Sequence, residues 1–139
     1  MSTGQVEPRA RPTDSEKITI NLGFVDLGQI DLLVRDGFYA NRTDFIRTAI
    51  RNQLGRHEDA LQKAVRRKKL DLGLHHYSAA DLEAVRAGGE MLDIQVLGLV
   101  TIAPDVTPEL AMQTIASISV LGALHAPAAV RAALAPRIR

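Results

Sequence analysis

The chain of 139 residues contains no cysteine and no tryptophan, and only five of its side chains are aromatic. Without cysteine it can form neither a disulfide framework nor a thiolate metal site. With so few aromatic rings, stacking of single-stranded bases is poorly supported, and any core must be mainly aliphatic. No apolar run approaches the roughly 18 residues of a membrane span. A hydrophobic content of 46% suits a globular protein with one ordinary domain or two very small ones.

Charge is unevenly distributed along the chain, although the formal total is only +1. Residues 1–69 contain 13 basic and 9 acidic side chains, a net of +4, whereas residues 70–139 contain 4 and 7, a net of −3. This asymmetry indicates that one end contacts a polyanion, with a merely solvated charged surface as the alternative. Residues 1–16, which include Arg9 and Arg11, are polar, so we expect a disordered basic arm, no secretory signal and a cytoplasmic location.

Residues 17–22 alternate strictly between polar and apolar side chains. This alternation has the period of a half-buried strand with two different faces. The apolar face consists of Ile18, Ile20 and Leu22, and the polar face consists of Lys17, Thr19 and Asn21.

Two helices are predicted directly after this strand. Apolar residues recur at three- and four-residue steps from Leu27 to Val34, and Asp36-Gly37 ends that helix. Asn41 can cap the second helix, with Asp44 three residues later as an approximate capping box. The apolar stripe of the second helix consists of Phe45, Ile46, Ala49, Ile50 and Leu54.

The predicted strand has no partner nearby in the sequence, because helices follow it at once. Its backbone groups need a ladder, and about forty residues are too few for an independent core. Both needs are met if two chains pair their strands antiparallel about a two-fold axis, so the sequence predicts an obligate homodimer. A coil at residues 17–22, or pairing within the same chain, would count against this interpretation. The predicted dimer core consists of Ile18, Ile20, Leu22, Ile30, Phe45, Ile46 and Ile50.

The stretch that starts with Lys17-Ile-Thr-Ile-Asn-Leu22 resembles a ribbon-helix-helix domain of the CopG type. The resemblance covers about residues 16–56 and includes the run from Gly37 to Arg51, with its Asn-Arg-Thr-Asp-Phe-Ile-Arg helix start. It implies a dimeric DNA-binding module whose paired strands insert into the major groove. It also implies that the second helices point their N-termini at phosphates.

General physics favours the same contacts. A two-stranded ribbon fits a major groove about 12 Å wide, where Lys17, Thr19 and Asn21 would contact bases. The helix start at Asn41, Arg42 and Thr43 offers free N–H groups to a phosphate. The alternatives are an ordinary polar strand face for the first three residues and plain helix capping for Asn41.

The rest of the chain is predicted to form a connector and a second unit. Residues 57–77 are expected to be helical and basic. In residues 78–139, Ser78 and Asp81 form a capping box, and Ile94–Gly98 recurs as Ile118–Gly122 at an offset of 24 residues.

Each copy of this near-repeat is interpreted as a strand, a glycine corner, a short strand and a helix. The copies are either solenoid-like coils or two unrelated strand–helix units. Because two coils bury little surface, we expect residues 78–139 to associate between chains or to bind a protein partner.

The predicted fold class is α+β, with a ribbon-helix-helix dimer followed by a small α/β unit. The predicted function is a sequence-specific, nucleoid-associated transcriptional repressor that needs no cofactor. The alternatives are an antitoxin or a DNA-anchored self-assembling scaffold. The four histidines are scattered, so no metal site is expected, and no enzyme is expected because P-loop, GxGxxG and HExxH motifs are absent.

Overall fold

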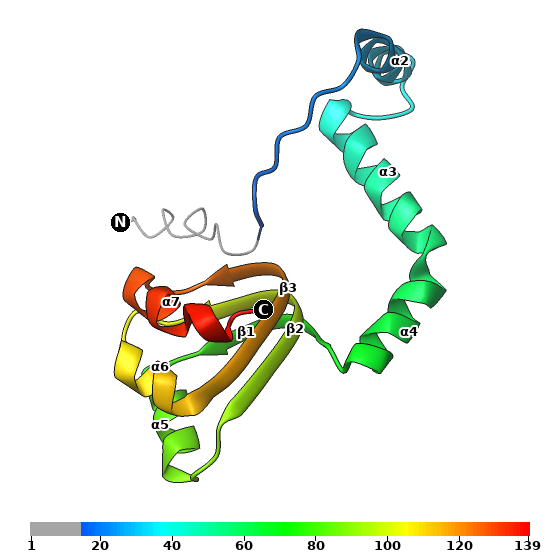
Figure 1. Ribbon diagram of the computed structural model, residues 1–139. Coiled ribbons are helices and arrows are strands. Elements are labelled where there is room, and N and C mark those ends of the chain that lie inside the picture. Colours follow the sequence, from blue (N-terminus) through cyan, green and yellow to red (C-terminus); the bar gives the residue numbers. More distant parts are fainter. Residues whose placement is uncertain (1–14) are drawn as a thin grey trace, which may run out of the picture. The chain divides into compact units, whose positions relative to one another are not determined.

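The computed structural model describes residues 15–139, so nearly all of the predicted basic arm, including Arg9 and Arg11, lies outside the described residues. The described chain divides after Ala64 into two compact units, residues 17–64 and residues 65–139. Figure 1 labels their helices and strands.

The first unit contains the two helices that the sequence predicts. Helix α2 spans Phe24–Arg35 and helix α3 spans Arg42–Arg56. Gly37, with a φ of 87°, follows the end of α2. The Gly37 N–H donates to Val34 O at 3.1 Å and the Phe38 N–H donates to Leu33 O at 2.9 Å, which is the Schellman pattern of helix termination.

The predicted strand at residues 17–22 is not formed within the single chain. These residues have no regular structure, and the pairings among the described residues do not include them. In Figure 1 they run as an extended trace that leads into α2. A strand exists only through hydrogen bonds to a neighbour, so the segment cannot become one without a partner from outside these residues. Within the single chain the segment is therefore a coil, the outcome that counts against the ribbon interpretation, and it pairs with no other described residue.

The second unit alternates strands and helices. Strand β1 spans Asp71–Tyr77, β2 spans Leu92–Ile102 and β3 spans Ile115–His125. They form one parallel sheet in the order β1-β2-β3. Helix α5 (Ala79–Ala87) follows β1, α6 (Pro108–Thr114) follows β2 and α7 (Ala128–Leu134) follows β3, before the 3-10 turn η3 at Ala135–Arg137.

The near-repeat is a pair of adjacent strands. Ile94 lies opposite Ile118, and Gly98 lies opposite Gly122, as the offset of 24 residues requires. The helix start predicted at Ser78 is also present, because Ser78 and Asp81 form a full capping box. The predicted glycine corners are wrong, however, since β2 and β3 each run unbroken through their glycine.

The helical connector predicted at residues 57–77 is wrong in its last part. Helix α4 spans Glu58–Lys68, but Asp71–Tyr77 is strand β1. Polar residues such as Asp71 and His76 hide the strand pattern in the sequence. The segment is a strand because it pairs with β2, about 25 residues further along, so the unit has three strand–helix repeats.

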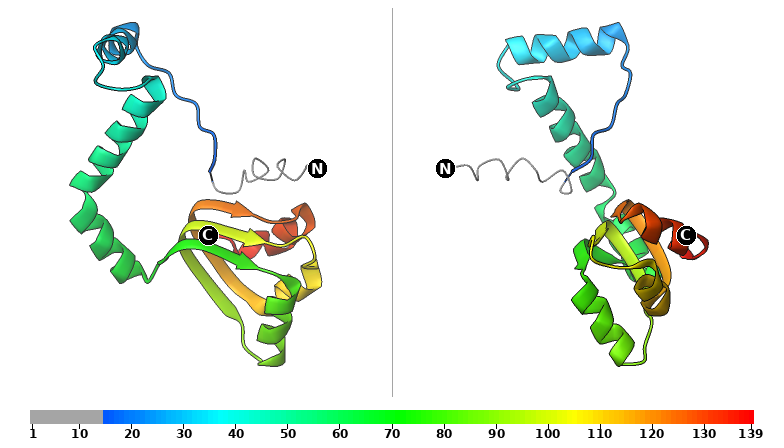
Figure 2. Two further views of the ribbon diagram at one scale, coloured as in Figure 1. Left: turned by 180° about the vertical axis from the view of Figure 1, so that it is seen from behind. Right: turned by 90° about the vertical axis from the view of Figure 1, so that its left-hand side faces the viewer.

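One face of the sheet forms the core of the second unit. Aliphatic side chains of the strands pack there against α5, α6 and α7, whose buried contributions include Leu82, Leu110 and Leu134. The left view of Figure 2 shows the sheet from behind. The face opposite the core carries exposed leucines, among them Leu72, Leu74 and Leu121, together with polar residues such as Gln95 and Ser119. Its first row consists of Leu72, Leu97 and Leu121, which lie opposite one another in the strand register.

Three glycines lie side by side across the sheet. Gly73, Gly98 and Gly122 have φ values of 125°, 142° and 126° and occupy one register position. A Cβ atom on Gly98 would overlap the carbonyl oxygen of Gly73, and one on Gly122 would overlap that of Gly98. At Gly98 and Gly122 the backbone angle and the close approach of the neighbouring strand both require glycine, whereas at Gly73 the backbone angle alone favours it.

We expect Gly98→Ala to lower the free energy of unfolding of the second unit by at least about 2 kcal/mol, because it combines an unfavourable φ with a clash against backbone. Gly88→Ala is a matched control, since Gly88 has a φ of −77° and a Cβ there makes only ordinary contacts. Urea unfolding followed by circular dichroism measures the difference. Equal stability of the two variants would contradict this account of the glycine row.

Candidate nucleic-acid interface

The first unit leaves most of its apolar side chains in solvent. Within residues 17–64 only Ile30 is buried. Ile18 and Ile20 are 74% and 61% exposed, and Ile50 of α3 is 48% exposed. Such exposure is unfavourable for a lone globular unit, because the free energy falls when apolar surface is removed from water. The single chain therefore supplies only part of a core.

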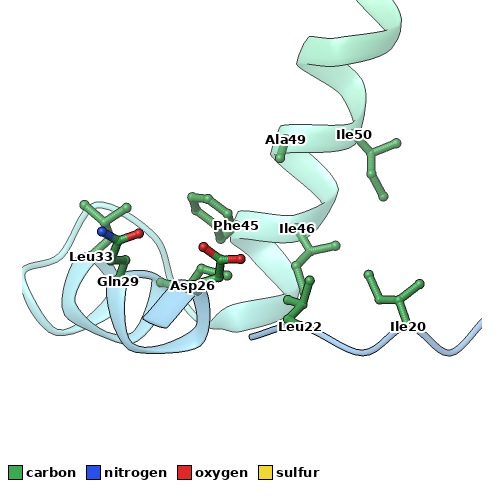
Figure 3. A pocket seen from close by; sticks show the side chains of 10 residues that line it. Ile20, Leu22, Asp26, Gln29, Leu33, Phe45, Ile46, Ala49 and Ile50 are labelled. Atoms are coloured by element: carbon green, nitrogen blue, oxygen red, sulfur yellow. The ribbon is translucent and has the colours of Figure 1, made fainter. Parts of the chain in front are cut away.

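These side chains surround an apolar hollow of about 420 Å³. Figure 3 shows that it lies between the extended segment, α2 and α3. Ile20 and Leu22 come from the segment, Leu33 from α2, and Phe45 and Ile46 from α3. Six of the seven predicted dimer-core residues line the hollow. The seventh, Ile18, is exposed and does not line it. The six are Ile20, Leu22, Ile30, Phe45, Ile46 and Ile50.

The start of α3 is organised by hydrogen bonds from Asn41 and Asp44. The Asn41 side chain accepts from the Asp44 N–H at 2.8 Å, so Asn41 is the helix cap. The Asp44 carboxylate accepts from the Ala40 N–H at 2.9 Å, one residue before the position of a regular capping box. The N–H groups of Arg42 and Thr43 have no acceptor among the described residues. They are the groups that a phosphate could accept from.

Arg42 is also bound to Asp31 of α2, which sequence reasoning missed. Its Nε and Nη2 atoms each donate to a carboxylate oxygen of Asp31 at 2.8 Å. These hydrogen bonds hold the pKa of Asp31 below its usual 3.8 and raise that of Arg42. No pattern links two residues 11 positions apart on different helices, so only the fold reveals the pair. Three guanidinium N–H groups of Arg42 remain available to another acceptor.

The turn between α2 and α3 is supported by a second contact that the sequence does not indicate. The rings of Tyr39 and Phe45 meet edge to face, with their centroids 5.0 Å apart and their planes at 82°. Such pairs contribute about 0.5–1.5 kcal/mol beyond area burial. The contact fixes the start of α3 relative to the turn that precedes it.

The three predicted base-contacting residues lie on the extended segment. Lys17, Thr19 and Asn21 are all exposed, and they alternate with the apolar residues of the predicted dimer core. The structure thus leaves them accessible, but it does not gather them with Arg42 and Thr43 into one site within the single chain.

Two other kinds of site have no counterpart in the part of the chain that the structure covers. Residues 15–139 contain no group of three or more His, Cys, Asp or Glu side chains arranged to hold a metal ion. Among the same residues, no helix has the length and apolar character to cross a membrane.

Comparison with known proteins agrees with the sequence resemblance and extends it. Residues 13–131 match the model of the Ribbon-Helix-Helix transcriptional regulator family. The chain belongs to this family, whose members generally bind DNA as dimers. The match continues through β1, β2, β3 and into α7, well beyond the 16–56 segment that carries the resemblance. No curated protein and no solved structure matches the chain.

We expect Ile46→Asp to raise the dimer dissociation constant at least about 100-fold, because it places a carboxylate in the apolar hollow that a second chain must fill. Asn52→Asp adds the same charge on an exposed position of α3 outside the hollow, and should leave the dimer intact. Sedimentation equilibrium and circular dichroism measure association and helix content. An Ile46→Asp protein that keeps both would exclude the hollow as the dimer core.

Proposed function

We propose that the protein is a sequence-specific DNA-binding repressor that acts as a homodimer and inserts a two-stranded ribbon into the major groove. The observation that carries this proposal is the unpaired, alternating segment at residues 17–22 beside an unfilled apolar hollow. Family membership makes the general class firm, and the arrangement below is our inference from the residues.

A second chain meets the needs of the first unit in one step. Antiparallel pairing of two copies of residues 17–22 gives each backbone its ladder and turns both apolar faces toward the hollows. Burying six aliphatic side chains at about 1.5–3 kcal/mol each is worth on the order of 10 kcal/mol. Association itself costs about 4–15 kcal/mol, so the helices must contribute apolar surface as well.

The same pairing turns two copies of the polar face outward. Lys17, Thr19 and Asn21 then present six side chains on one ridge. Lysine donates to guanine O6 and N7, and asparagine pairs with adenine N6 and N7. Threonine can form a hydrogen bond to a base edge or make an apolar contact with the methyl group of thymine. These are the chemistries that distinguish base pairs in the major groove.

The start of α3 would fix the ribbon on the DNA backbone. The N–H groups of Arg42 and Thr43, together with the positive end of the helix dipole, suit a phosphate oxygen. Asp31 keeps the Arg42 side chain at this end of α3 and leaves three of its donors available.

The second unit has the properties of an association module. It has its own core, and its sheet exposes Leu72, Leu74 and Leu121 on the face opposite the helices. We infer that it joins DNA-bound dimers into larger assemblies, which raises the effective concentration at neighbouring sites. A folded second unit does not favour the antitoxin alternative, whose partner-binding segment needs no core of its own.

Asn21→Ala should relax sequence preference, because the bidentate contact to adenine is lost. We expect discrimination between the operator and scrambled DNA to fall by about 1–3 kcal/mol per contact. Fluorescence anisotropy on an operator recovered by genome-wide selection of bound DNA measures it. Asn52→Ala serves as control on α3. Unchanged preference in the Asn21 variant would refute its role in base recognition.

Arg42→Ala should weaken binding to all DNA alike and lower the salt slope by about one per lost contact, or about two per dimer. Asp31→Asn breaks the same ion pair but keeps the arginine, so it should weaken binding much less than Arg42→Ala does. The two variants are compared by anisotropy titrations over a range of salt concentrations. Equal weakening by both would mean that Arg42 only positions α3.

A further inference from the structure

The glycine row shows which way the backbone of each strand faces. The carbonyl of Gly73 points to β2 at Gly98, and the carbonyl of Gly98 points to β3 at Gly122. The same repeat directs the carbonyl of Gly122 to the outer edge of β3. At the opposite end of the row, the position that a Cβ would take on Gly73 faces open space among the described residues.

The outer edge of β3 is occupied only at its two ends. Ile118 forms a bridge with Ile138, and its carbonyl accepts from the Arg139 N–H at 2.8 Å. The Leu124 carbonyl accepts a hydrogen bond from the Arg131 side chain. Because strand geometry has a period of two, the carbonyls of Val120 and Gly122 face the same edge. Neither carbonyl accepts a hydrogen bond from another described residue.

The C-terminal residues cover the part of β3 that has no counterpart in β1. The first residue of β1, Asp71, lies opposite Val96, which lies opposite Val120. Strand β1 therefore has no residue at the level of Ile118, where Ile138 is bound. The chain enters β1 through Lys69, which the register would place at this level and whose φ of 54° departs from a strand conformation. The open length of β3 thus corresponds to the length of β1.

We propose that β1 of a second copy of this chain pairs in parallel with the outer edge of β3, with its Gly73 opposite Gly122. The glycine row then continues from one molecule into the next in the register that β1, β2 and β3 already use. Gly73 has nearly the same φ as Gly122, 125° against 126°, so the joint repeats a conformation that the sheet already contains.

Side chains on the sheet favour this joint. Leu72 and Leu121, which are 65% and 54% exposed, become neighbours and extend the Leu72–Leu97–Leu121 row. Removing both from water is favourable. Arg131 does not prevent the pairing, because the Leu124 carbonyl has two lone pairs and can accept from the side chain and from an incoming N–H.

The joint is heterologous, since two different edges meet, so it does not close at two copies. Each molecule that binds through its β1 presents its own β3 edge to the next molecule. This inference rests on the association that we propose for the second unit and specifies its partner and geometry. Combined with a two-fold ribbon dimer, it would allow dimers to assemble side by side along DNA.

Single cysteines in this cysteine-free chain can test the joint. Purified Leu72→Cys and Leu121→Cys proteins are mixed, oxidised and run on a non-reducing gel. Across the joint the two positions lie one strand spacing apart, about 4.8 Å, which a disulfide can bridge. Within one chain Leu97 separates them, so the spacing is about twice as large and no internal disulfide competes. We expect a covalent dimer from the mixture and none from either variant alone.

The register has its own control. Leu74 lies opposite Leu99, which lies opposite Ala123. Leu74→Cys should therefore cross-link with Ala123→Cys and only weakly with Leu121→Cys, and the double variant Leu72→Cys/Leu121→Cys should give a ladder of higher species.

Each competing arrangement predicts a different product. Cross-linking of Leu72→Cys alone would mean that two β1 edges pair, and cross-linking of Leu97→Cys alone would mean that two sheet faces stack. Either result, or no cross-link at all, overturns the joint. DNA binding of the same variants is measured in parallel. If binding persists without the cross-link, the joint fails while the regulator stands, whereas a cross-link without DNA binding leaves the joint and removes the regulator.

Discussion

Residues 17–22 carry backbone N–H and C=O groups that no other residue of the described chain pairs, and the first unit depends on how that need is met. The six residues alternate in polarity, so any neighbour that pairs with them also separates an apolar face from a polar one. The apolar face belongs to the hollow with α2 and α3, and the polar face is left for solvent or a ligand. One requirement of the backbone thus links the folding of the first unit, its proposed dimerisation and the position of the side chains that we propose contact DNA. Deleting residues 17–22 would therefore affect all three together.

The second unit meets a related requirement differently. Its three strands pair with one another, and the glycine row leaves room for the carbonyl of one strand to lie close to the next strand. A sheet of three strands nevertheless has two edges, and open edges invite pairing. The C-terminal residues protect one part of the β3 edge, and Arg131 reaches another. Association at the remaining edge and dimerisation through the ribbon would use the same interaction, a backbone ladder completed between chains.

Polar contacts of the first unit set the local geometry at the start of α3. Asp31 orients Arg42, and Asn41 with Asp44 organises the start of α3. These contacts are exposed, and exposed ion pairs contribute little to stability. Their value is geometric, because a phosphate is recognised by donors that already point in one direction. A carboxylate beside the proposed phosphate site also limits the attraction for arbitrary polyanions, which would help the base contacts to decide where the protein binds.

Local sequence determined the elements whose causes are local. The Schellman end of α2, the Asn41 cap, the Ser78 capping box and the pairing of the Ile94 and Ile118 repeats all follow from residue types at short or regular spacing. The sequence alone also indicated that residues 17–22 lack a partner. Only the tertiary structure decided the rest. Residues 71–77 form a strand because β2 lies beside them. Gly98 and Gly122 lie within strands, where carbonyl groups of the neighbouring strand occupy the space that a side chain would need. Arg42 contacts Asp31 because α2 and α3 converge. Each of these depends on atoms that are distant in the sequence, and no local pattern encodes such distances.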